Sequence, residues 1–125
     1  MAERTRVLVA EDSPTVRAHL VEALTSDRAV DVVAVAEDGR SAVDLCAELH
    51  PDVITMDMAM PGMNGLDLQR ELQLQGHRIP IIFITAHTDV AVRSRALAQG
   101  AVGVLLKPFK DTELLAAVQA ALRAS

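Results

Sequence analysis

The sequence has almost no aromatic residues: Phe83 and Phe109 are its two Phe, and Tyr and Trp are absent. Surfaces that bind single-stranded nucleic acid stack bases on several aromatic side chains, so such a surface is not expected. The sequence also lacks an excess of positive charge: its net charge is −5, and it contains no long run of Lys or Arg. Direct binding to a nucleic-acid backbone, which needs clustered Lys and Arg, is therefore disfavoured.

Cysteine and long apolar stretches are also lacking. Cys46 is the only cysteine, so no internal disulfide can form, and its apolar position in a predicted helix indicates a small buried side chain. No apolar stretch reaches the roughly 18 residues of a membrane span. The first residues lead directly into a strand-like run rather than the core of a signal peptide. We therefore expect a cytoplasmic protein without membrane association.

Half of the residues are hydrophobic, and they form five short aliphatic runs separated by longer segments with helical spacing. The runs typical of strands cover residues 6–10, 30–36, 53–56, 81–85 and 102–106. Strict alternation of strand and helix predicts an α/β domain, a (βα)5 doubly wound fold with a five-stranded parallel sheet and helices on both faces. Residues 1–125 are expected to form this single domain, with no output domain in the chain.

Capping residues in the sequence support the predicted helix boundaries. Ser13 followed by Pro14 predicts an N-cap with proline at the first helical position. Gly76 and Gly100 are placed to end two of the helices.

Polar residues follow four of the predicted strands. Glu11 and Asp12 come after the first, Asp57 after the third, Thr85 after the fourth and Lys107 after the fifth. In an open parallel sheet the ligand site lies beyond the carboxyl ends of the strands, so these side chains should converge. Each residue alone is an ordinary turn or cap residue, but five of them at one edge favour a functional site.

Three clustered carboxylates need compensating positive charge. Lys107 and a divalent cation would provide it, and Mg²⁺ prefers a few carboxylate oxygens with retained waters. No His or Cys stands among these strand ends to indicate zinc or copper. Mg²⁺ is the expected metal.

These strand-end residues belong to motifs that resemble the receiver domains of two-component response regulators, in order and spacing and over essentially the whole chain. The motifs are Val-Leu-Val-Ala-Glu11-Asp12, Met56-Asp57-Met-Ala-Met-Pro61-Gly62-Met-Asn-Gly65, Thr85-Ala86 and Lys107-Pro108-Phe109. The resemblance implies the flavodoxin-like strand order 2-1-3-4-5. It also implies a signalling domain, rather than an enzyme with a separate substrate, that assists its own phosphorylation and dephosphorylation.

The same resemblance assigns roles around Asp57, the implied phosphoacceptor. Glu11, Asp12, Asp57 and the backbone carbonyl of Ala59 would hold Mg²⁺. The phosphoryl oxygens would be met by Lys107, by the Thr85 hydroxyl and by the amides of Met58 and Ala86.

Movement of Thr85 toward a new phosphoryl group would then reshape the face formed by the fourth helix, the fifth strand and the fifth helix. The chain departs from the family here, because Val104 occupies the position of the usual Tyr or Phe switch residue. This places the rotating-aromatic part of the switch in question and leaves the phosphorylation chemistry untouched.

The resemblance also implies the partners. A sensor histidine kinase or phosphotransfer protein would dock beside the first helix, and an effector domain or protein would receive the signal. The candidate docking residues on the first helix, with ordinary helix surface as the alternative, are Pro14, Arg17, Ala18 and Val21.

Two features leave alternatives open. The last helix has no charged residue between Glu113 and Arg123, which fits a homodimer through the output face and fits equally the high helix propensity of its alanines. The first half of the chain is similar to chemotaxis methylesterase receivers, whereas the second half is similar to receivers of transcriptional regulators.

Three other functions compete with the receiver hypothesis. A haloacid-dehalogenase-type phosphohydrolase would need a second Asp where Ala59 stands, and a flavodoxin would need a hydroxyl-rich phosphate loop and aromatics for its flavin. A pseudo-receiver, acting as a constitutive interaction module, usually loses acidic residues that this chain keeps, although Val104 leaves that alternative open.

Overall fold

The computed structural model describes residues 4–60, 63–86 and 90–124. Its centre is a five-stranded parallel sheet in the order β2-β1-β3-β6-β7, which confirms the predicted fold and strand order. The strands are β1 (Thr5–Ala10), β2 (Val30–Ala36), β3 (Val53–Asp57), β6 (Ile81–Thr85) and β7 (Gly103–Leu106).

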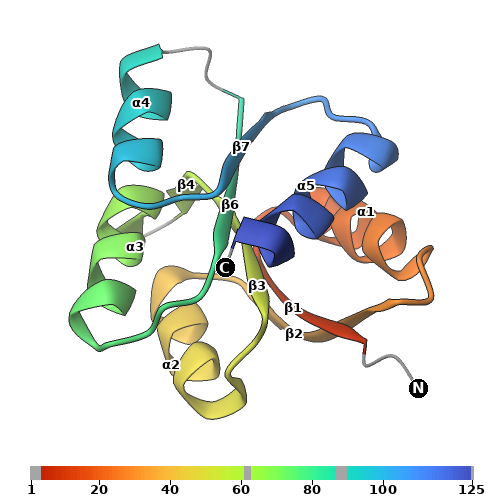
Figure 1. Ribbon diagram of the computed structural model, residues 1–125, viewed down its shortest axis with the longest axis horizontal. Helices are drawn as coiled ribbons and strands as arrows, with labels where there is room; N and C mark the ends of the chain where they lie inside the picture. Colours follow the sequence, from red (N-terminus) through yellow and green to blue (C-terminus); the bar gives the residue numbers. More distant parts are fainter. Residues whose placement is uncertain (1–3, 61–62, 87–89, 125) are drawn as a thin grey trace.

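Five helices cover the two faces of this sheet (Figure 1). The helices α1 (Pro14–Thr25) and α5 (Asp111–Ala124) pack on one face. The opposite face carries α2 (Gly39–Leu49), α3 (Gly65–Leu74) and α4 (Val90–Ala98). None of the described helices is both long enough and apolar enough to cross a membrane.

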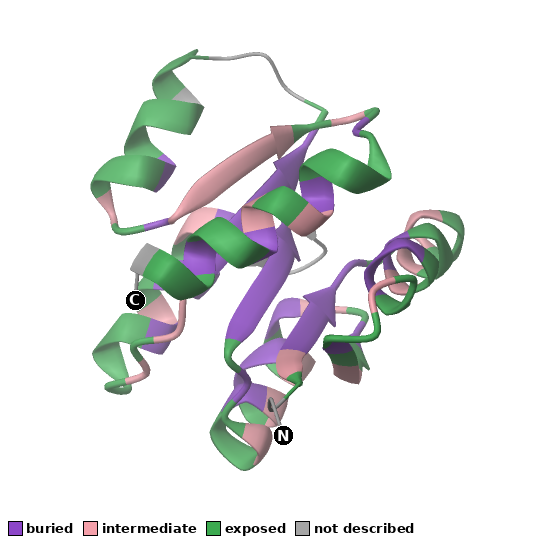
Figure 2. Ribbon diagram, turned by 45° about the vertical axis from the view of Figure 1, so that its right-hand side comes forward, coloured by how far each residue is buried: buried purple, intermediate pink, exposed green. Residues whose placement is uncertain are grey.

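Each face has its own aliphatic core, because successive residues of a strand point to opposite sides of the sheet. On β1, Leu8 packs in the core that α2 and α3 cover (the α2–α3 core), whereas Val7 and Val9 pack in the core that α1 and α5 cover (the α1–α5 core). The central strands are buried along their length, and the helices expose their outer sides (Figure 2). Burial on both faces explains why these strands are apolar without alternation. Cys46 is buried in the α2–α3 core, as its position in the sequence predicted.

The helices begin and end at the predicted capping residues. The Ser13 hydroxyl accepts a hydrogen bond of 3.4 Å from the amide of Val16, and Pro14 opens α1. Gly76 and Gly100 follow α3 and α4 with φ of 82° and 106°, a left-handed conformation that glycine adopts without steric cost. Both helices therefore end where glycine allows the chain to turn toward the next strand.

The structure adds one element that the sequence did not predict. A small antiparallel pair, β4 (Ala59–Met60) with β5 (Met63–Asn64), lies between β3 and α3. Two-residue strands are too short to produce the alternating pattern by which a strand is recognised. This pair shapes the segment that leaves Asp57 and enters α3.

Candidate functional site

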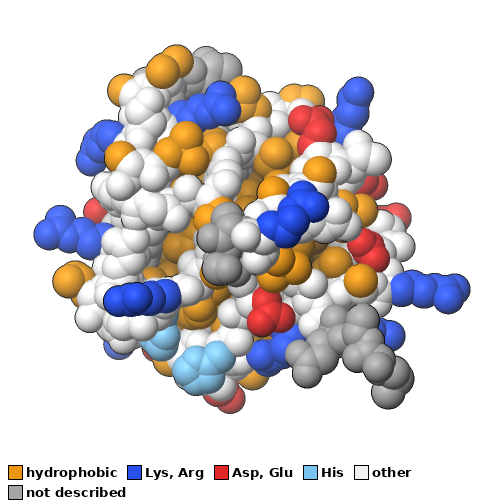
Figure 3. Space-filling view, viewed as in Figure 1, with side chains coloured by type: hydrophobic (Ala, Val, Ile, Leu, Met, Phe, Trp, Pro, Cys, Tyr) orange, Lys and Arg blue, Asp and Glu red, His pale blue; other side chains and the backbone are white. Residues whose placement is uncertain are grey.

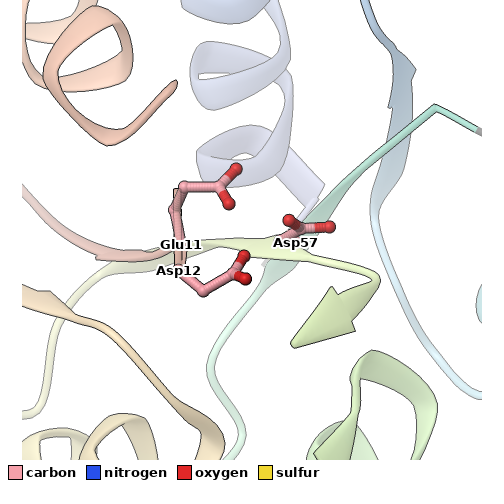
Figure 4. A group of neighbouring side chains, drawn as sticks. All are labelled: Glu11, Asp12 and Asp57. Atoms are coloured by element: carbon pink, nitrogen blue, oxygen red, sulfur yellow. The ribbon is translucent and has the colours of Figure 1, made fainter. Parts of the chain in front are cut away.

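Three carboxylates meet at the carboxyl edge of the sheet. Asp57 is the last residue of β3, and Glu11 and Asp12 directly follow the neighbouring strand β1. Ala10 is paired with Met56 in the β1–β3 register, so Glu11 lies level with Asp57. Each of the three acids offers an oxygen within 4.8 Å of the others, and their side chains converge on one space (Figure 4). The sequence predicted this convergence.

Lys107, the residue after β7, supplies a cation to the same place. Its Nζ lies 3.2 Å from Oε1 of Glu11 and 3.4 Å from Oδ2 of Asp57. The Lys107 amide donates a 2.8 Å hydrogen bond to the Thr85 carbonyl, which ties the end of β7 to the end of β6. The ammonium group therefore bridges carboxylates from two different strands.

The electrostatics of this site are unbalanced without a metal. The Glu11 carboxyl is completely buried, and this desolvation is the main cause that raises the pKa of Glu11 to about 7. The hydrogen bond and the negative charge of Asp57 raise this pKa further, whereas the Ser13 amide and Lys107 lower it. One ammonium thus only partly offsets three acids.

The donor set suits Mg²⁺. Carboxylate oxygens from three residues meet within a few ångströms, and hard oxygen ligands are what Mg²⁺ selects. A divalent cation here would lower the pKa of Glu11 and relieve the repulsion between Glu11 and Asp57. Glu11, Asp12 and Asp57 are the side chains that could hold it.

The remaining predicted residues lie at the ends of β3 and β6 or directly after them. Thr85 is buried at the end of β6, and Ala86 is exposed just beyond it. The Met58 amide donates to the Ile84 carbonyl at 3.1 Å, so contact with a phosphoryl oxygen would have to share or replace that bond. Ala59 begins β4, one residue after Met58.

Val104 is a core-packed residue of the edge strand β7. It is partly buried on β7, where it is paired with Phe83 and packs against the α2–α3 core. Its short side chain cannot sweep the arc that a Tyr or Phe would sweep at this position.

Two contacts of α1 with the site were not predicted. The His19 ring stacks on Phe109 with 5.4 Å between ring centroids, and its Nε2 forms a 3.0 Å hydrogen bond with Oδ1 of Asp111. Arg17, predicted only as a candidate docking residue, donates to the Glu11 carbonyl at 3.1 Å. Helical spacing shows which face of α1 is apolar, but it does not show where a long polar side chain ends.

Comparison with known proteins decides the family. The family model described as the response regulator receiver domain matches residues 7–119, most of the chain. The chain belongs to the response regulator receiver family. Receivers of this family bind Mg²⁺ at an acidic pocket, and Glu11, Asp12 and Asp57 form an acidic cluster in this receiver.

Relatives of this receiver include both kinds that the sequence suggested. The transcriptional regulatory protein NarL of Mycobacterium tuberculosis is 38% identical over 116 residues, covering 93% of this chain and 54% of that protein. Protein-glutamate methylesterase/protein-glutamine glutaminase 4 of Geobacter metallireducens is 41% identical over 106 residues, covering 82% of this chain and 30% of that protein. The receiver thus spans about half of NarL and less than a third of the methylesterase, so only their receiver parts are matched.

Solved receiver structures agree closely with this one. The signal receiver domain of NarL from M. tuberculosis superposes with a TM-score of 0.93 at 36% identity, covering 98% of this chain and 99% of that chain. The response regulator domain of Thermotoga maritima CheB gives 0.90 at 32% identity, with the same coverage of both chains. No observation calls for the pseudo-receiver alternative, because the acids and the lysine meet in one place.

Proposed function

We propose that this receiver accepts a phosphoryl group on Asp57, from a histidine kinase or phosphotransfer protein, with Mg²⁺ held by Glu11, Asp12, Asp57 and the Ala59 carbonyl. The observation that carries the proposal is the meeting of three carboxylates with Lys107 at one sheet edge. Residues 1–125 would act as one switch whose output lies in another domain or protein.

The geometry suggests how the chain's own residues take part. A carboxylate oxygen of Asp57 attacks phosphorus, a P–O bond forms and the P–N bond to the donor imidazole breaks. The donor ring, protonated on its other nitrogen, takes the electron pair of that bond and leaves as neutral imidazole. Lys107 already lies 3.4 Å from Asp57 and meets an oxygen of the incoming group as negative charge spreads over it. Bound Mg²⁺ supplies further charge neutralisation.

Thr85 and two backbone amides complete the proposed phosphoryl cradle. The buried Thr85 hydroxyl stands at the end of β6 beside Asp57's strand. The amides of Met58 and Ala86 would donate hydrogen bonds to the remaining oxygens. The Met58 amide would then exchange its bond to Ile84, which loosens the junction of β3 and β6 as the phosphoryl group arrives.

A hollow beside the site fits a docking partner. A cavity of about 320 Å³ lies between α1 and the β7–α5 loop. Its walls include Val16 and Phe109, and Lys107 stands at its side. An apolar contact there would bring a donor imidazole to the edge of the sheet that carries Asp57, which supports docking of the phosphodonor protein on this side.

The output surface is proposed on the opposite flank. Hydrophobic side chains gather between α4 and α5 in the space-filling view (Figure 3). Leu97 of α4, Leu106 of β7 and Leu122 of α5 are each exposed by more than a third. We place the effector contact, or a homodimer contact, on this α4-β7-α5 face.

Intact-mass measurement tests the phosphoacceptor directly. The chain is incubated with a small-molecule phosphodonor in Mg²⁺ or in chelator, as wild type, Asp57→Asn and Asp31→Asn. We expect one added phosphoryl group on wild type and on Asp31→Asn, an exposed control on β2, and only in Mg²⁺. Asp57→Asn should show none. Equal labelling of Asp57→Asn would move the acceptor elsewhere, and no adduct on any form would return the pseudo-receiver alternative.

A further inference from the structure

The guanidinium of Arg17 is bonded to the segment that carries the first two acids. Its Nη1 donates to the Glu11 carbonyl at 3.1 Å, and its Nη2 lies 3.4 Å from Oε1 of Glu37. The Arg17 side chain is 20% exposed, whereas that of Glu37 is 74% exposed. The arginine is therefore folded back from α1 toward the site and does not extend into solvent.

The carbonyl that Arg17 holds has a particular place in the chain. It belongs to the peptide unit that joins Glu11 to Asp12. Because a peptide unit is planar and rigid, fixing the direction of this carbonyl restricts where Asp12 can lie. The arginine thus acts on the backbone between two proposed metal ligands, from a helix that begins only after them.

The two acids differ in what else holds them. The Glu11 carboxylate accepts from Lys107 at 3.2 Å and from the Ser13 amide at 3.2 Å. Asp12 is exposed, and no group within the described ranges forms a hydrogen bond or ion pair with its carboxylate. The position of that carboxylate therefore depends on the backbone, and the bond from Arg17 is one of the contacts that fix this backbone.

We propose that Arg17 is a positioning residue for Mg²⁺ binding, which orients the Glu11–Asp12 peptide so that Asp12 joins Glu11 and Asp57 around the cation. This inference rests on the proposed function, since it assumes that these acids hold Mg²⁺. An arginine suits the task because its planar fork presents separate, rigidly spaced donors to the carbonyl and to Glu37, whereas a lysine has one compact ammonium on a flexible stem. Groups that orient metal ligands typically change metal affinity by about 10-fold or more when removed.

The competing role for Arg17 is its ion pair with Glu37, which would only fasten the β2–α2 loop to α1. Exposed ion pairs contribute little to stability, and Glu37 is largely exposed. Glu37→Gln removes the charge pair and leaves the bond to the Glu11 carbonyl, so this variant separates the two roles.

The test compares Mg²⁺ dissociation constants of wild type, Arg17→Met, Arg17→Lys and Glu37→Gln, measured by calorimetry because the chain has no Trp to report binding. Met keeps the apolar stem of arginine and removes its donors. We expect Arg17→Met to raise the dissociation constant about 10-fold. The dissociation constant of Arg17→Lys should fall between those of wild type and Arg17→Met, and that of Glu37→Gln should stay within about 2-fold of wild type. The melting temperature of each variant in chelator serves as the fold check.

Phosphorylation rates provide a second readout that a merely structural role would not produce. At limiting Mg²⁺ Arg17→Met should be labelled more slowly than wild type, whereas at saturating Mg²⁺ its rate should return to within about 2-fold. A rate that stays low at saturating Mg²⁺ would overturn the positioning role, because the arginine would then act on the chemical step or on the fold.

The outcomes separate this inference from the proposed function. A wild-type dissociation constant in Arg17→Met overturns the inference alone, as does an equal loss of affinity in Glu37→Gln. If wild type itself binds no Mg²⁺, the inference and the proposed function fall together. Should Arg17→Met not fold, Arg17→Lys decides: an unchanged dissociation constant overturns the proposal, and a rise of several-fold supports it.

Discussion

Glu11 shows how far a single residue is held from its usual chemistry. Its carboxyl is fully buried beside Asp57, and one ammonium serves both acids. The sequence could predict that these groups meet, because residues that end parallel strands share one edge of the sheet. It could not predict the pKa of Glu11, which depends on how completely the side chain is desolvated once α1 and α5 are packed.

The raised pKa of Glu11 predicts a pH dependence of stability in the metal-free protein. Between the usual Glu pKa of 4.5 and the raised pKa of about 7, Glu11 keeps its proton in the folded state and releases it in the unfolded state. The stability of the folded state therefore falls as the pH rises through this window, by up to about 3 kcal/mol. Glu11→Gln keeps the shape without the charge and should lose this slope.

Urea unfolding in chelator, at about pH 5 and about pH 8, measures this effect. Glu48→Gln, an exposed control on α2, should keep the wild-type slope. Equal slopes for wild type and Glu11→Gln would show that Glu11 ionises in the folded state as easily as in the unfolded chain.

At the scale of the element, the approach of α3 to the sheet depends on a glycine. A Cβ on Gly65 would lie 2.6 Å from Cε1 of Phe83 and 3.0 Å from the Cα of Met58. Phe83 is fully buried and Met58 offers backbone, so neither can move freely. The first turn of α3 therefore lies closer to Phe83 of β6 and to the Met58 backbone than a side chain at this position would allow.

Gly65→Ala should destabilise the protein by about 1–3 kcal/mol, because the added methyl overpacks this junction. Gly103→Ala is the matched control, since its Cβ would meet only Ile82 at 4.0 Å, and it should stay within about 0.5 kcal/mol of wild type. Thermal and urea unfolding measure both. A neutral Gly65→Ala would mean that α3 shifts outward at little cost.

The sequence predicted elements better than it predicted contacts between them. Five aliphatic runs and the glycines after α3 and α4 were sufficient for the five main strands and two helix ends. The pair β4–β5 was missed because two-residue strands carry no period. The bond from Arg17 to the Glu11 carbonyl was missed because it depends on how α1 packs beside β1, which no local pattern encodes.

At the scale of the whole molecule, Mg²⁺ should couple to folding. The three acids lie together only when β1 and β3 are paired, so a cation that bridges them binds the folded state preferentially. At a Mg²⁺ concentration about 100 times the dissociation constant, the gain is roughly 2.7 kcal/mol, or a melting temperature higher by about 10 °C. Asp12→Asn should lose most of this rise and Asp31→Asn should retain it; a Mg²⁺-independent melting temperature in wild type would contradict the metal site.

With Val104 at the switch position, the phosphoryl signal must reach the output face without an aromatic side chain that turns. Val104 is paired with Phe83 in the sheet and packs against the α2–α3 core, so the route left to the α4-β7-α5 face is backbone movement at the ends of β6 and β7. The bond from the Lys107 amide to the Thr85 carbonyl ties these ends together. A phosphoryl analogue should therefore shift amide resonances of Lys107 and Leu106 more than those at the C-terminal end of α4.

Val104→Phe tests this route, since it restores a side chain that can turn as Thr85 moves. Analogue-induced amide shifts over α4 should grow in Val104→Phe and stay near wild type in Val104→Ile, a control that adds bulk without a ring. Large shifts over α4 in wild type would mean that the helix responds without the aromatic. Unchanged spectra on β7 with bound analogue would mean that Asp57 and the output face are uncoupled.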